Sequence, residues 1–190
     1  MFPLEKENQM LKKRVAPLII IMMLAFAATA SAKITLKPGE MAPNFKLEGS
    51  DGAWRTLSSF RGQYVVLYFY PMDETPGCTT EACTFRNHLS SITKEGAKVI
   101  GVSVQTVKSH LAFIKKYHLN FLLLADPTHK VANEYGVYNA KWKVDNRVTF
   151  LLNPEGKIVK IYPKVDPKMN AGQIMAEMRM LKSKIKAHKN

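Results

Sequence analysis

The 190-residue sequence has little cysteine, few acidic residues and no long apolar run beyond its N-terminal region. Its two cysteines, Cys78 and Cys83, are too few for a disulfide-rich scaffold or for a zinc site made of cysteine alone. The absence of further apolar runs of about 20 residues excludes a protein with several membrane spans. A hydrophobic fraction of 46% instead indicates a globular domain with an ordinary core.

The shortage of acidic residues leaves the chain basic, with 28 Lys and Arg against 15 Asp and Glu and a formal charge of +13. Such a charge can attract nucleic acid. The lysines are scattered, however, and a cluster occurs only near the C-terminus, at Lys182, Lys184, Lys186 and Lys189. Because no RNA-reading aromatic motif accompanies them, we predict a solvated basic surface and no nucleic-acid partner.

Residues 1–32 have the features of a secretory signal peptide. Lys12, Lys13 and Arg14 precede an uncharged, mostly apolar segment, residues 15–32, which ends in the small-x-small cleavage pattern Ala-Ser-Ala. The pattern predicts an exported protein, in the bacterial periplasm, with a mature chain of residues 33–190. The alternative is an uncleaved anchor, because such a segment is at the lower limit of spanning length. Membrane association is expected only in that case.

Beyond the leader, strand patterns alternate with helical patterns. Apolar runs typical of buried strands occur at residues 64–70, 98–104 and 121–124. Helical patterns occur at residues 76–95, 108–117, 129–135 and 171–186. An Asn-Pro-Glu-Gly turn between residues 148–152 and 157–162 predicts an antiparallel hairpin. This order predicts one α/β domain, residues 33–190, with a mixed central β-sheet flanked by helices.

Cys78 lies where the helix over residues 76–95 is expected to begin. Thr75 is a favourable N-cap, and Pro76 suits the first helical position because its missing N–H needs no partner there. Cys78 then falls in the first turn, where the helix dipole favours a thiolate. Lowering the pKa of a thiol from about 8.5 to about 6 takes roughly 3 kcal/mol, whereas a helix terminus supplies about 0.3–1 kcal/mol. A cation from elsewhere in the fold is therefore expected beside Cys78.

The five-residue spacing between Cys78 and Cys83 has a mechanical consequence. On an ideal helix the two Cα atoms lie roughly 8.7 Å apart, whereas a disulfide requires less than about 7 Å. If one intact helix holds both cysteines, they can be bridged only after its first turns unwind. A static disulfide, the usual fate of two cysteines in an exported protein, remains the alternative at this point.

The pattern Pro71-x-x-x-Thr75-x-x-Cys78 resembles the active-site motif of the peroxiredoxins. Residues 69–83 resemble the branch known as peroxiredoxin Q or bacterioferritin comigratory protein, and the similarity extends over residues 38–186. Further similar segments are Gly101-Val-Ser103, Ser109-His110, Lys116-Tyr117, residues 123–126, Tyr135-Gly136-Val137 and residues 147–151. The resemblance implies a thioredoxin-like fold, no metal or organic cofactor, and a monomer.

The same resemblance implies a thiol peroxidase that reduces hydrogen peroxide and organic hydroperoxides. Cys78 would be the peroxidatic cysteine, and Cys83 the resolving cysteine that forms an intramolecular disulfide with it. Thr75 would hold the peroxide and the thiolate through its hydroxyl, and Pro71 would shield the pocket. A thioredoxin-like protein would reduce the disulfide again.

Arg147 would supply the cation that the energy estimate requires, and Glu81 would orient it. The chain departs from the family pattern at Val148, where Ser or Thr is common, at Leu122, where Pro is common, and at residues 105–106, where Asp is frequent. These departures put the preferred reductant and local packing in question rather than the chemistry. The five histidines show no metal-ligand spacing, and we interpret them as surface or packing residues.

Two other functions compete with the peroxidase. An exported thiol–disulfide oxidoreductase of thioredoxin-like fold would use a Cys-x-x-Cys motif and a proline before a strand threonine. This chain has four residues between its cysteines and Val148 before Thr149, so both features are absent. A disulfide-stapled, non-catalytic binding module is supported only by the basic charge.

Overall fold

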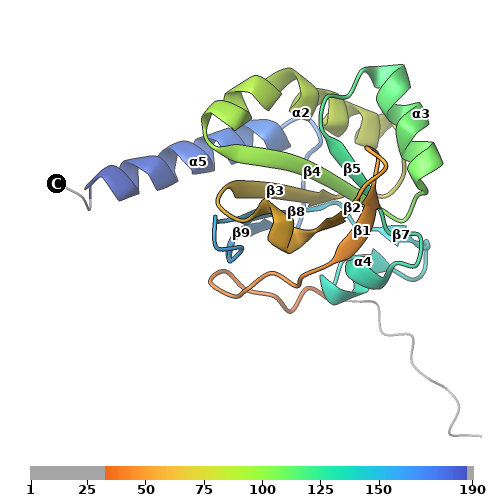
Figure 1. Cartoon of the computed structure of the whole chain (residues 1–190), viewed down its shortest axis with the longest axis horizontal. Helices are drawn as coiled ribbons and strands as arrows, with labels where there is room; N and C mark the ends of the chain where they lie inside the picture. The colour runs from red at the N-terminus through yellow and green to blue at the C-terminus, as the bar shows by residue number, and fades with distance from the viewer. Residues whose placement is uncertain (1–32, 188–190) are drawn as a thin grey trace, which may run out of the picture. The chain divides into compact units, whose positions relative to one another are not determined.

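The computed structural model describes residues 33–187, so the predicted leader lies outside the described residues and its cleavage stays a prediction. A mixed seven-stranded sheet lies at the centre, in the order β2-β1-β5-β4-β3-β8-β9 (Figure 1). Its strands are β1 (Lys46–Gly49), β2 (Trp54–Thr56), β3 (Tyr64–Phe69), β4 (Ala97–Ser103), β5 (Leu122–Ala125), β8 (Val148–Leu152) and β9 (Ile158–Tyr162). The β3, β4 and β5 strands are parallel, and the other pairs are antiparallel.

Helices connect the parallel strands, as the alternating sequence pattern predicts. The longer ones are α2 (Pro76–Lys94), α3 (Val107–Tyr117) and α5 (Asn170–Ala187), and the shorter ones are η1 (Leu57–Phe60) and α4 (Lys130–Glu134). A small two-stranded sheet of β6 (Tyr138–Asn139) and β7 (Val144–Asp145) precedes β8. This small sheet is not predicted from the sequence, because strands of two residues leave no periodic pattern.

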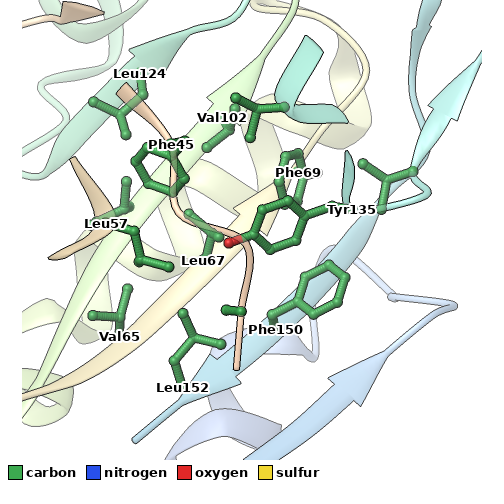
Figure 2. Close-up of a cluster of buried hydrophobic side chains, with 14 of the residues drawn as sticks. Phe45, Leu57, Val65, Leu67, Phe69, Val102, Leu124, Tyr135, Phe150 and Leu152 are labelled. Atoms are coloured by element: carbon green, nitrogen blue, oxygen red, sulfur yellow. The ribbon is translucent and has the colours of Figure 1, made fainter. Parts of the chain in front are cut away.

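Two hydrophobic clusters fill the two faces of the sheet, and β3 contributes alternate residues to each. Val65, Leu67 and Phe69 join the cluster that is closed by η1, α4 and the N-terminal part of the domain (Figure 2). Val66 and Tyr68 face the other cluster, which includes residues of α2, α3 and α5. Both faces of β3 are therefore buried, which explains its unbroken apolar sequence.

The structure confirms the α/β class and the mixed sheet, and each predicted strand and helix is present within two residues of its expected ends. One detail of α5 differs: helical spacing places Ile185 on the same stripe as Ile174 and Met178, but Ile185 is 47% exposed. Ile174 and Met178 are buried on that stripe, whereas the last turns of α5 extend past the sheet (Figure 1). Within residues 33–187, none of the helices combines the length and apolarity that a membrane span requires.

Candidate active site

Pro71 and Thr75 lie in the loop that follows the carboxyl end of β3, and Cys78 lies in the first turn of α2 directly after that loop. Glu74 has a positive φ of 61°, and Thr75 is extended, so the chain turns sharply before α2 begins at Pro76. The Thr79 amide donates to the Thr75 carbonyl at 2.8 Å and closes the first helical turn. Thr75 therefore occupies the N-cap position that the sequence predicts.

The expected capping role of the Thr75 side chain is wrong. Within the described chain its hydroxyl makes no cap hydrogen bond and instead donates to the Met72 carbonyl at 3.0 Å. This bond spans the sharp turn at Glu74 and holds the loop closed on itself. Pro71 lies half-buried between β3 and this turn.

Cys78 is a buried thiol with a cation beside it. Its side chain is 1% exposed, and Arg147 donates from Nη2 to the Cys78 sulfur at 3.2 Å. The register explains the approach: Val148 pairs with Phe69, so Arg147 lies next to the point where the chain leaves β3. Gly77 leaves space for the guanidinium, since a Cβ there would lie 3.2 Å from Arg147 Nη2.

Glu81 is fully buried one turn after Cys78 and forms an ion pair with Arg147 Nη1. Burial raises the pKa of the Glu81 carboxyl, while Arg147 and a hydrogen bond from Asn170 oppose that rise. Burial would lower the pKa of Arg147, but the Glu81 carboxylate and the hydrogen bonds that Arg147 donates to Glu81 and to the Cys78 sulfur raise it overall. Arg147 thus remains a cation, and its two terminal nitrogens are divided between the carboxylate and the sulfur.

Cys83 lies in the same uninterrupted helix as Cys78 and is half-buried. Both thiols are free among residues 33–187, and an intact helix separates their Cα atoms by roughly 8.7 Å. The structure therefore shows the reduced, dithiol form of the protein, in which an unbroken α2 contains both cysteines. A bond between the two sulfurs requires part of α2 to unwind.

A second cluster of polar side chains, centred on Asp73 of the loop between β3 and α2, is not predicted from the sequence. Asp73 accepts a hydrogen bond from the Tyr70 hydroxyl at 2.8 Å and one from the Ser109 hydroxyl at 2.6 Å. Its other neighbour is His110 Nδ1 at 2.9 Å, and His110 Nε2 lies 3.2 Å from the Leu124 carbonyl. His110 is fully buried, so its interpretation as a surface or packing residue is incomplete: it fastens the loop to α3.

No signal in a single sequence links residues 37 positions apart such as Asp73 and His110. The sequence offers two weaker signals for this pair: a carboxylate two residues after Pro71, and a histidine on the apolar face of a helix. Among the described residues, no group of three or more His, Cys, Asp and Glu side chains is arranged to hold a metal ion.

The sheet and the cysteine at the head of α2 define the class: a thioredoxin-like fold that carries a thiol beside an arginine. The AhpC/TSA family model matches residues 38–161. The chain belongs to this family and is a peroxiredoxin of the Bcp and peroxiredoxin Q type, a peroxidase among the oxidoreductases.

Curated relatives and solved structures agree on this branch. Peroxiredoxin Bcp of Bacillus subtilis is 38% identical over 157 residues, which are 80% of this chain and all of that protein. Chloroplastic peroxiredoxin Q of Populus jackii is 41% identical over 144 residues, 73% of this chain and 68% of that protein. A Xanthomonas campestris peroxiredoxin Q structure is 35% identical with a TM-score of 0.70, covering 77% of this chain and 97% of that one. A bacterioferritin comigratory protein of the same organism is 34% identical with a TM-score of 0.70, covering 78% and 98%.

Proposed function

We propose that Cys78 is the peroxidatic cysteine of this peroxiredoxin, with hydrogen peroxide and organic hydroperoxides as substrates. The observation that carries the proposal is the 3.2 Å contact between Arg147 Nη2 and the buried Cys78 sulfur at the first turn of α2. The N-terminus of α2 and the Arg147 guanidinium are both placed to stabilise negative charge that develops on this sulfur. Organic hydroperoxides are included because the similar Xanthomonas bacterioferritin comigratory protein has alkyl peroxide reduction activity.

In the first step the Cys78 thiolate attacks the terminal oxygen of the hydroperoxide. The O–O bond breaks, a sulfenic acid forms on Cys78, and the departing alkoxide or hydroxide takes a proton to leave as alcohol or water. Arg147 stabilises the charge that moves from sulfur to the leaving oxygen. We assign the Thr75 hydroxyl to hold the peroxide and the thiolate, and its O–H must leave the Met72 carbonyl before it can donate to the thiolate. We assign Pro71 to shield the pocket from water.

In the second step the Cys83 thiol condenses with the sulfenic acid, which releases water and leaves a Cys78–Cys83 disulfide. Because both residues lie on α2, the first turns of that helix must unwind before the sulfurs meet. A dithiol reductant of the thioredoxin type then reduces the disulfide and is itself oxidised. Local unfolding is thus part of the catalytic cycle.

The leader sequence supports a periplasmic site of action, and the reductant would then be a periplasmic thioredoxin-like protein. The protein would act as a monomer. The competing thiol–disulfide oxidoreductase function finds no support in the related proteins, which are peroxiredoxins.

Intact mass measurement after one equivalent of peroxide tests both cysteine roles. The wild-type protein is expected to lose about two daltons as the disulfide forms, from atomic masses. Cys83→Ser is expected to gain about sixteen daltons as the sulfenic acid persists. Cys78→Ser serves as the control, and peroxide consumption that survives this substitution would refute the assignment of Cys78.

A further inference from the structure

The buried carboxylate of Glu81 has two partners, and only Arg147 belongs to the reaction proposed above. The other is Asn170, the first residue of α5, whose Nδ2 donates to Glu81 Oε1 at 2.8 Å. Asn170 is fully buried, and its Nδ2 also donates to the Thr149 hydroxyl at 2.7 Å. The Asn170 amide thus links α5 to α2 through Glu81 and to β8 through Thr149.

The orientation of the Asn170 amide follows from its neighbours. The opposite orientation would direct its carbonyl oxygen at the Glu81 carboxylate, so that two acceptors would face each other. In the observed orientation Oδ1 is buried without a hydrogen-bond partner among residues 33–187. Leaving a buried carbonyl oxygen without a hydrogen bond is unfavourable. The observed orientation of the amide therefore provides a hydrogen bond to Glu81 at the cost of leaving Asn170 Oδ1 without one.

Arg147 needs such an anchor because its side chain is long and comes from the loop before β8. The Arg147 side chain is 17% exposed, whereas the Glu81 side chain is fully buried, so Arg147 has a route to solvent that Glu81 lacks. Glu81 Oε2 pairs with Arg147 Nη1, and the planar guanidinium then presents Nη2 to Cys78. The position of Glu81 therefore decides where Nη2 points.

We propose that Asn170 is a positioning residue for Cys78, which it serves by fixing Glu81 and thereby holding the Arg147 guanidinium against the sulfur. The inference rests on the proposed role of Cys78. The charge of Glu81 by itself disfavours a neighbouring thiolate, so its contribution is geometric. Loss of the Asn170 contact frees the carboxylate, and Arg147 turns away from Cys78.

The test measures the rate at which iodoacetamide alkylates Cys78 from pH 4.5 to pH 9 in a Cys83→Ser background. Asn170→Leu has a similar size and no N–H, and we expect it to slow alkylation roughly tenfold at pH 7, in line with the loss of a hydrogen bond to a charged group. Asn170→His places Nδ1–H at the same distance along the side chain and is expected to restore the rate to within about threefold. If Asn170→Leu does not fold, Asn170→Ala takes its place, because it also removes the N–H and is too small to overfill the site.

Thr149→Val is the matched control, since it removes the other partner of the same amide and leaves Glu81 in contact. We expect it to lower the melting temperature without changing the alkylation profile by more than about twofold. In a Glu81→Met background, which has no acceptor for the Asn170 amide, Asn170→Leu should have no further effect on the rate, since Asn170 acts through the carboxylate.

An unchanged or faster alkylation rate in Asn170→Leu overturns the proposal, as does a Thr149→Val variant that is slowed equally. The assay contains no peroxide. A wild-type protein that fails to consume hydroperoxide therefore refutes the peroxidase assignment of Cys78 and still leaves the alkylation rates to decide the role of Asn170.

Discussion

Asp145 of β7 is a buried carboxyl group that weakens the fold as the pH rises. It is 1% exposed, and neither of its carboxyl oxygens has a hydrogen-bond partner within residues 33–187. Burial, with a smaller contribution from the charge of Asp126, raises the pKa of Asp145 to about 8 from an ordinary 3.8. Asp145 is therefore neutral in the folded protein at pH 7 and ionised in the unfolded chain.

The sign and size of the effect follow from proton linkage. Well below pH 3.8 both states are protonated, and the ionisation of Asp145 contributes nothing to stability. As the pH rises toward 8 the unfolded chain alone loses the proton, so the folded state is destabilised progressively, by about 6 kcal/mol once both are ionised. Between about pH 5 and about pH 7.5 the loss is about 3 kcal/mol.

We expect Asp145→Asn, which has the same shape and no ionisable group, to remove this dependence. Urea unfolding of the reduced proteins, followed by circular dichroism at about pH 5 and about pH 7.5, measures it. The free energy of unfolding of the wild type should fall relative to the variant by about 3 kcal/mol across this interval. Asn146→Asp, at the exposed neighbouring position, is the control and should track the wild type. Parallel curves for wild type and Asp145→Asn would refute the reasoning.

Three further predictions concern the site and the loops around it. Arg147→Met keeps most of the unbranched stem and removes the charge, and it should slow Cys78 alkylation at pH 7 by roughly 10- to 100-fold while circular dichroism stays unchanged. An equal rate would show that the guanidinium does not activate the thiol. His110→Leu should lower the free energy of unfolding by about 1.5–3 kcal/mol because it removes one of the three side chains that hydrogen-bond the buried Asp73 carboxyl group. Adding Asp73→Leu should recover part of this loss in urea titrations. Gly136→Ala should lower the free energy of unfolding by more than about 1 kcal/mol, because Gly136 has a φ of 67° and a Cβ would lie 2.5 Å from the Lys33 carbonyl oxygen. A melting temperature equal to that of the wild type would contradict this prediction.

Local sequence determined the elements and the place of the cysteine. The apolar run of β3, the Thr-Pro start of α2 and the turn between β8 and β9 depend on neighbouring residues, and for that reason they can be read from order alone. Position in the helix also follows from order, so the five-residue spacing by itself requires α2 to unwind before Cys78 meets Cys83. The need for a cation beside Cys78 also follows from residue order, because the helix terminus supplies only part of the free energy that stabilises a thiolate.

Tertiary structure decided which distant groups meet. Residue order does not reveal that β3 pairs with β8 in the register that brings Arg147 to Cys78, and the assignment of Arg147 depended on resemblance to a family. The contacts of Asn170 with Glu81 and of His110 with Asp73 join residues 89 and 37 positions apart, and Asp145 differs from a surface aspartate only by its burial. Hydrogen bonds and burial at these positions arise only when the sheet and its covering helices have packed, because packing sets both distance and access to water.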